Sequence, residues 1–61
     1  MKAANRDFTR ELNLFNILNS IREAGSISRV EIAEKTGQSK ASVTNITALL
    51  IERGLIYEDQ V

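Results

Sequence analysis

The side chains best suited to specific chemistry in this sequence stand in the segment that ends at Glu52. Ala41, Thr44, Asn45 and Ala48 are small or carry neutral hydrogen-bonding groups, and no acidic residue lies among them. Such side chains can come close to base edges and phosphates, because they bring neither bulk nor negative charge. The chemistry that they predict is hydrogen bonding to a polar surface such as the edge of a base pair.

Composition excludes most catalytic and metal-binding classes. The 61 residues include no cysteine and no histidine, which removes disulfides, Cys/His zinc sites, Ser-His-Asp triads and cysteine nucleophiles. We therefore expect no catalytic residue of these kinds, no metal site and no cofactor. No apolar run approaches the roughly 18 residues of a membrane span, and the lack of cysteine fits a cytoplasmic protein without a membrane partner.

Net charge alone gives little support to nucleic-acid binding. Eight basic and eight acidic side chains cancel over the whole chain, whereas a strongly nucleic-acid-binding domain is usually basic. Glu58 and Asp59 lie in the last four residues, so residues 1–57 carry eight basic and six acidic groups, a net charge of +2. So weak a bias also suits an ordinary solvated surface.

Apolar spacing predicts one domain over residues 1–61, built of three helices. Residues 1–6 are polar, and we expect them to form a disordered arm. The first helix runs from a cap at Asp7 to Ala24, and Gly25 ends it.

Two shorter helices follow, and each has a clear start and stop. Ser28 and Glu31 form a capping box at the start of the second helix, which ends near Gly37. Ser39 caps the third helix, which runs to about Arg53. Isolated helices shorter than about 12–15 residues are marginal in water, so both must pack on the first helix. The side chains expected to be buried are Val30, Ile32 and Ala33 in the second helix and Val43, Ile46, Thr47 and Leu50 in the third.

Two short helices joined at a glycine turn make a helix-turn-helix. The second helix of such a pair is held as a rigid rod with a free outer face, and a rod of that width fits the major groove of B-DNA. Gly37 can take the positive φ that the turn needs, and Ala33 is small where the two helices approach. Each feature also suits a plain three-helix bundle, so the joint spacing is the more specific signal.

The residues around this pattern resemble a known family. "ISR" (27–29) opens the second helix, "ASVTNIT" (41–47) lies in the third, and "LIERGLI" (50–56) leaves it. In this register they resemble the DNA-binding domain of the ROK family of bacterial transcription factors, which includes sugar-responsive repressors. The resemblance implies a mostly α fold, a three-helix winged helix-turn-helix with a small, truncated β-wing. Leu55-Ile56-Tyr57 would be its first strand, and Ile27 should pair beside it as a short strand.

The resemblance also implies which residues would meet DNA. Bases would be read by four side chains of the third helix: Ser42, Thr44, Asn45 and Ala41. Phosphates would be held by three residues at the starts of the second and third helices: Arg29, Ser39 and Lys40. Three further cations would help to position the domain: Lys2, Arg6 and Arg10. The implied partners are double-stranded DNA, a second subunit in a homodimer of the full-length protein, and a sugar bound through a C-terminal domain absent from this sequence.

Three features depart from the family pattern. Gln38 stands in the turn where an apolar residue is expected, which predicts a looser corner. Asn45 and Ala48 stand where sugar repressors of the family often carry lysine or arginine, which predicts a weaker phosphate grip and a different operator. The chain also ends at Val61, where the family continues through a wing into a large sugar-binding, kinase-like domain. Because the kinase-like part and its zinc ligands are absent from this sequence, we expect no enzyme activity.

The sequence leaves two other functions open. A winged-helix protein-interaction module without DNA binding is favoured by the zero net charge. A self-standing structural dimer is the third class. Salt-dependent binding to duplex DNA separates a groove binder from both, because such binding releases counterions.

The first helix carries more apolar surface than one core needs. Phe8, Leu12 and Phe15 form one stripe, which we call the Phe8 stripe. A second stripe is rotated round the helix axis and comprises Leu14, Ile17, Leu18 and Ile21. A helix that packs on one side needs an apolar arc of only about 100°. A thin domain that wraps the whole helix is the simpler account, and the sharper hypothesis is that the Phe8 stripe is exposed and docks on a further domain or a second subunit.

Overall fold

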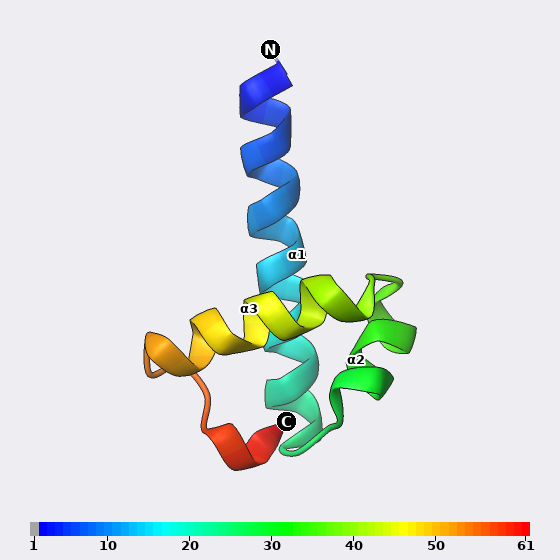
Figure 1. Ribbon diagram of the computed structural model, residues 1–61, viewed down its shortest axis with the longest axis vertical. Coiled ribbons are helices and arrows are strands. Elements are labelled where there is room, and N and C mark those ends of the chain that lie inside the picture. Colours follow the sequence, from blue (N-terminus) through cyan, green and yellow to red (C-terminus); the bar gives the residue numbers. More distant parts are fainter. Residues whose placement is uncertain (1) are drawn as a thin grey trace.

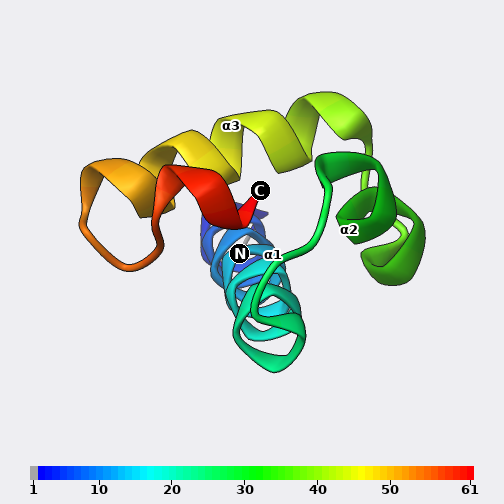
Figure 2. The same cartoon turned by 90° about the horizontal axis from the view of Figure 1, so that it is seen from below.

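The computed structural model describes the backbone of residues 2–61 and the side chains from Phe8 onward. Its elements are α1 (Lys2–Ala24), α2 (Arg29–Thr36), α3 (Lys40–Glu52) and a single turn of 3-10 helix, η1 (Glu58–Gln60). Figure 1 shows α3 crossing α1, with α2 and η1 on opposite sides of the C-terminal half of α1. The same arrangement is seen from below in Figure 2. The prediction of a mostly α, three-helix fold is confirmed.

α1 begins at Lys2 and not at Asp7, so the predicted cap at Asp7 is wrong. The stretch before Asp7 contains two alanines and no glycine or proline, and nothing in it stops a helix. The helix ends at Ala24 as predicted, and the Gly25 amide donates to the Ile21 carbonyl at 2.8 Å. The domain bounds, residues 1–61 with a disordered arm at residues 1–6, stay a prediction.

Local hydrogen bonds fix both ends of α2. The Ser28 hydroxyl accepts from the Glu31 amide at 3.1 Å, and the Glu31 carboxylate accepts from the Ser28 amide at 3.4 Å, which completes the predicted capping box. Gly37 has φ of 73°, and its amide donates to the Ala33 carbonyl at 2.9 Å. A residue with a Cβ would be strained in that conformation, so glycine is what allows the chain to leave α2 so sharply.

The ends of α3 also follow from local chemistry. Ser39 caps the start, where its hydroxyl accepts from the Ser42 amide at 3.1 Å. At the other end the Gly54 amide donates to the Ile51 carbonyl, and the Leu55 amide donates to the Leu50 carbonyl at 2.9 Å. This pair of bonds is a Schellman motif, which satisfies carbonyls that the last turn of a helix would otherwise leave free.

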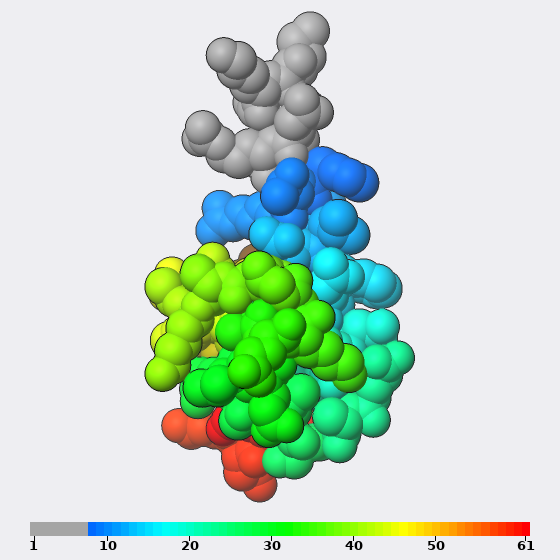
Figure 3. All heavy atoms as spheres, turned by 90° about the vertical axis from the view of Figure 1, so that its right-hand side faces the viewer, coloured from blue at the N-terminus to red at the C-terminus, as the bar shows by residue number. Residues whose placement is uncertain are grey.

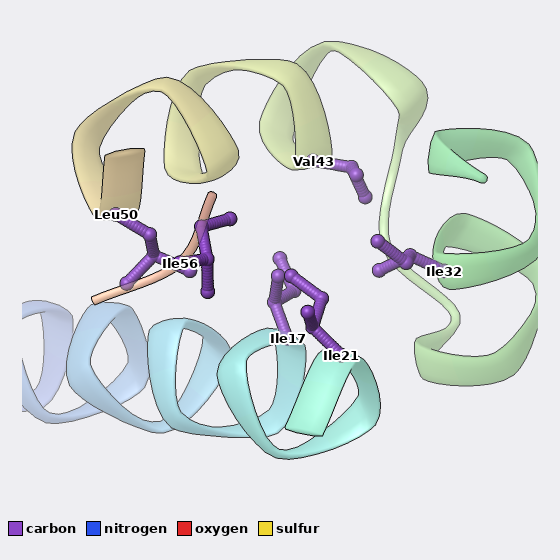
Figure 4. Packing of buried hydrophobic residues seen from close by; sticks show 6 residues of the cluster. All are labelled: Ile17, Ile21, Ile32, Val43, Leu50 and Ile56. Atoms are coloured by element: carbon purple, nitrogen blue, oxygen red, sulfur yellow. The ribbon is translucent and has the colours of Figure 1, made fainter. Parts of the chain in front are cut away.

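Six apolar side chains from every part of the fold meet in the core. They are Ile17 and Ile21 of α1, Ile32 of α2, Val43 and Leu50 of α3, and Ile56 beyond it, and none is more than 4% exposed. Figure 4 shows them converging from the three helices and the C-terminal segment on one space.

Four of the side chains expected to be buried in α2 and α3 are fully buried: Ile32, Val43, Thr47 and Leu50. Thr47 is fully buried beside the core, and Ala33 and Ile46 pack against it half-buried. Val30 is 48% exposed, so its predicted burial is wrong. It precedes Ile32 by two residues, which places it roughly 200° away round the helix and on the opposite side from the core.

The Phe8 stripe is exposed, as the sharper hypothesis for the first helix required. Phe8, Leu12 and Phe15 are 67%, 46% and 60% exposed, whereas Ile17 and Ile21 are fully buried. Figure 3 shows the first coloured turns of α1, in blue, lying beyond the body formed by the other helices. The stripe is therefore available as a contact surface, and its docking on a further domain or a second subunit stays a prediction.

The predicted strand pairing between Ile27 and Leu55-Ile56-Tyr57 is wrong, and the described residues contain no strand. The Ile27 amide donates instead to the Gln60 carbonyl at 2.8 Å. Two amides of the expected strand are already taken. The Leu55 amide caps α3, and the Tyr57 amide donates to the Gln60 side chain at 2.7 Å. With these groups bonded locally, the chain turns into η1 and does not extend beside Ile27.

Gln38 connects the turn before α3 to α1. Its side-chain amide donates to the Asn13 carbonyl at 3.3 Å. Its carbonyl oxygen is buried and has no hydrogen-bond partner among the residues that the structure describes. Gln38 was expected to loosen this corner, but its side chain bonds the turn before α3 to α1. Its side-chain oxygen is the buried polar atom that stays unpaired among the described residues.

Replacing Gln38 by leucine should raise the free energy of unfolding by about 1 kcal/mol. The substitution gives up one long hydrogen bond and removes an unpaired buried oxygen, whose cost is roughly 1–3 kcal/mol. Chemical denaturation monitored by circular dichroism measures the change. Gln38→Glu is the matched control, because it keeps the shape and buries a charge, and it should lower stability. A Gln38→Leu variant less stable than the wild type would contradict this account.

Candidate nucleic-acid interface

The outer face of α3 is held outward by the row of residues buried on its other side. Val43, Thr47 and Leu50 are fully buried at helical spacing and fix the rotation of α3 about its axis. The residues that this rotation leaves exposed are Ala41, Thr44, Asn45 and Ala48. The structure thus brings three of the four expected base-reading residues together on one solvent-facing surface, with Ala48 beside them.

Ser42 differs from the other residues expected to read bases, because it is half-buried. Its amide is bonded to the Ser39 hydroxyl, so Ser39 serves first as the cap of α3. A phosphate contact from Ser39 would use only its hydroxyl proton. Lys40 is the first residue of α3 and is exposed, which puts its charge at the end of the helix where anions are favoured.

Arg29 lies against one edge of the exposed face of α3. It is the first residue of α2, and its Nε donates to the Thr47 hydroxyl at 3.4 Å. The Thr47 hydroxyl in turn donates to the Thr44 carbonyl at 3.1 Å. The sequence showed Thr47 only as a position in the buried row. Its second role is to hold a half-buried guanidinium whose remaining N–H groups can reach an anion.

A groove on the other edge of that face was not expected from the sequence. It lies between α1 and α3, has a volume of about 360 Å³, and is lined by Thr9, Arg10, Asn13, Ser42, Asn45 and Ile46. We call it the α1–α3 groove. It brings Arg10, one of the three cations expected to position the domain, next to two of the expected base-reading residues. The other two cations, Lys2 and Arg6, lie outside the described side chains.

The three helices that form this interface match a known protein family. A family model described as winged helix-turn-helix DNA-binding matches residues 10–57, which include α2, α3 and most of α1. The chain belongs to this winged helix-turn-helix DNA-binding family. Double-stranded DNA is therefore the partner of the domain, and the family is one of binding domains and not of enzymes.

Curated relatives of this winged helix-turn-helix domain are bacterial regulators. The chain is 48% identical over 54 residues to the DNA-binding transcriptional dual regulator NagC of Escherichia coli K12 and to the N-acetylglucosamine repressors of Escherichia coli O157:H7 and Shigella flexneri. The match covers 88% of this chain and 13% of each relative. These similarities confirm the resemblance to ROK-type repressors. No solved structure gives a significant match.

Two other kinds of feature are absent from the part of the chain that the structure describes. None of its helices is long and apolar enough to cross a membrane. No group of three or more His, Cys, Asp or Glu side chains is placed so that it could hold a metal ion.

Replacing Thr47 by valine should weaken DNA binding while leaving the fold nearly unchanged. Valine keeps the buried shape, and the lost hydrogen bonds are offset by added apolar burial, so stability should change by less than about 1 kcal/mol. Arg29 would no longer be held in place, and affinity for duplex DNA should fall roughly three- to tenfold. Fluorescence anisotropy with a labelled duplex and thermal melting give the two quantities.

Thr36→Val is the matched control for this substitution. The Thr36 hydroxyl donates to the Ile32 carbonyl at 2.7 Å, so the same hydroxyl is lost at the far end of α2. If the two variants lose affinity equally, Thr47 does not position Arg29 for DNA binding.

Proposed function

We propose that this chain is the sequence-specific DNA-binding domain of a sugar-responsive ROK-type transcriptional regulator, with α3 in the major groove. The observation that carries the proposal is the exposed face of α3, which presents only small or neutral hydrogen-bonding side chains at Ala41, Thr44, Asn45 and Ala48. In a helix-turn-helix, the exposed face of the second helix of the pair is the surface that contacts base edges in the major groove.

Three residues of the face have a chemical role in this proposal. Asn45 can bond in a bidentate manner to adenine, and the methyl groups of Thr44 and Ala41 can contact the methyl group of thymine. Arg29, Lys40 and the Ser39 hydroxyl would bond to phosphates and set the register of the helix. The sequence also places Ser42 among the base readers, a role that its half-buried position makes secondary.

The activity of the whole protein is a wider proposal. The chain spans about 13% of the length of the curated relatives it matches, and the names of those relatives include a dual regulator and repressors for N-acetylglucosamine. By that similarity, the full-length protein would act on bacterial DNA in the cytoplasm. It would bind two half-sites as a homodimer and respond to a sugar held by a C-terminal domain. A single recognition helix reads few base pairs, which favours a second half-site.

The rival proposal is a winged-helix protein-interaction module without DNA binding, which the zero net charge favours. The wild-type chain should bind duplex DNA with an affinity that falls as salt rises, by a slope of about −0.9 for each phosphate neutralised. Arg29 and Lys40 alone would give a slope of roughly −2, and each further cation that engages a phosphate would make it steeper by about 0.9. Anisotropy titrations between about 50 and 200 mM salt measure it. No binding at the low end, or a flat salt response, would support the interaction module.

Asn45→Ala should cost about 1–3 kcal/mol on the preferred site and relax discrimination at one base pair, because a bidentate base contact is lost. Lys40→Ala should weaken binding to all sequences alike and reduce the salt slope by about one ion. The preferred site is first selected from a pool of random duplexes, and each variant is then titrated on that site and on random DNA. If Asn45→Ala loses as much affinity on random DNA as on the preferred site, Asn45 does not read a base.

A further inference from the structure

The α1–α3 groove has the lining of an anion site on a protein surface. Five of its six residues carry hydrogen-bonding side chains, one of them the cationic Arg10, and no carboxylate lines it. Ile46 is the apolar residue in the lining of the groove. Guanidinium, amide and hydroxyl groups are those that proteins use to bind DNA phosphates and sugars. We propose that this groove holds backbone phosphates of the DNA strand that borders the major groove, on the edge of α3 opposite Arg29.

The position of the groove round α3 supports this assignment, which rests on the proposed function. Ser42, which lines the groove, and Thr47, which bonds Arg29, are five residues apart and thus roughly 140° apart round the helix. The buried residues lie within that arc, among them Val43 and Leu50. Ser42 and Thr47 therefore mark the two edges of the exposed face. A helix lying in the major groove has one DNA backbone on each side, and each edge of α3 has an arginine beside it.

Arg10 and Arg53 extend this positive edge along α3. A second groove is lined by Arg10, Glu11, Leu14, Leu49 and Arg53, so Arg10 stands between the two grooves. A DNA backbone that runs along this edge would meet Arg10 and then Arg53. Glu11 is the one acidic residue in that lining, and its charge would oppose the phosphates there.

The groove exists before DNA arrives, because α1 is joined to the turn that leads into α3. The Gln38 side chain, in the turn before α3, donates to the carbonyl of Asn13, a residue of α1 that lines the groove. A site that is already formed loses less conformational entropy when it binds. The groove also gives Ser42 a different role from the one implied by resemblance: its half-buried hydroxyl would meet the backbone and not a base edge.

The first test compares Arg10→Ala with Arg22→Ala. Both variants remove one exposed arginine from α1, but Arg22 lies twelve residues further on, about 18 Å along the helix. Arg10→Ala should lower affinity about tenfold on preferred and random duplexes alike and reduce the salt slope by about one ion. Arg22→Ala should do neither, and thermal melting of both variants should match the wild type. Glu11→Gln should raise affinity on all duplexes.

The second test places the phosphates. Duplexes that carry a neutral methylphosphonate at one position each are titrated with the wild type, Arg10→Ala and Arg29→Ala. A methylphosphonate at a phosphate that Arg10 contacts should weaken binding of the wild type but not of Arg10→Ala, and the same should hold for Arg29 and Arg29→Ala. The phosphates assigned to Arg10 and those assigned to Arg29 should lie on opposite sides of the major groove. Ser42→Ala should lower affinity roughly three- to fivefold with unchanged sequence preference, in contrast to Asn45→Ala.

The outcomes separate this inference from the proposed function. If the wild-type chain binds duplex DNA and Arg10→Ala behaves like Arg22→Ala, the groove does not hold phosphate and only this inference fails. The same holds if the Arg10 and Arg29 phosphates coincide, or if Ser42→Ala relaxes base preference. If the wild type shows no salt-dependent binding, the proposed function fails and this inference fails with it.

Discussion

The burial of Ile32 is the contact on which the helix-turn-helix depends. α2 has eight residues, too few to stay helical in water by their own hydrogen bonds. Ile32 is its one fully buried side chain, and it joins Ile17 and Ile21 of α1 and Val43 of α3 in the same cluster. Burying an isoleucine contributes roughly 1.5–3 kcal/mol, and with the two caps this is enough to hold a short helix against a long one. Without that contact α2 would have no fully buried side chain to hold it against α1, and the turn at Gly37 would be held only from its α3 side, through Gln38.

The same core decides which side of α3 is free. Because Val43, Thr47 and Leu50 are committed to the interior, the exposed face follows from helical geometry and needs no further interaction to define it. The two edges of that face depend on further interactions. One depends on the hydroxyl of Thr47, which holds Arg29, and the other on the length of α1, which continues past the core and brings Arg10 beside Ser42. Stability and recognition are therefore coupled through α3, since its buried row and its outer face rotate together.

Local signals in the sequence predicted the helices after Gly25 well. Caps at Ser28 and Ser39 and stops at Gly37 and Gly54 act within a few residues, so pattern is enough to find them. The errors arose where several parts of the chain compete for the same groups. The Leu55 and Tyr57 amides are taken by the end of α3 and by Gln60, which no strand propensity reveals. The start of α1 was placed too late because no stop signal precedes Asp7, and the α1–α3 groove arises only when two distant segments are packed together.

Zero net charge is compatible with a DNA-binding domain when the charges are distributed as they are here. Arg10, Arg29, Lys40 and Arg53 lie in or beside α3 together with the acidic Glu11 and Glu52, whereas Glu58 and Asp59 lie in η1 at the end of the chain. At physiological salt, screening acts over about 8 Å, so a phosphate at α3 responds mainly to the cations beside it. The small net field should give weak attraction to DNA in general, because nonspecific affinity follows the number of neutralised phosphates. Discrimination between sites would then rest on the neutral contacts of Asn45 and Thr44, and tight binding on the pairing of two such domains on one operator.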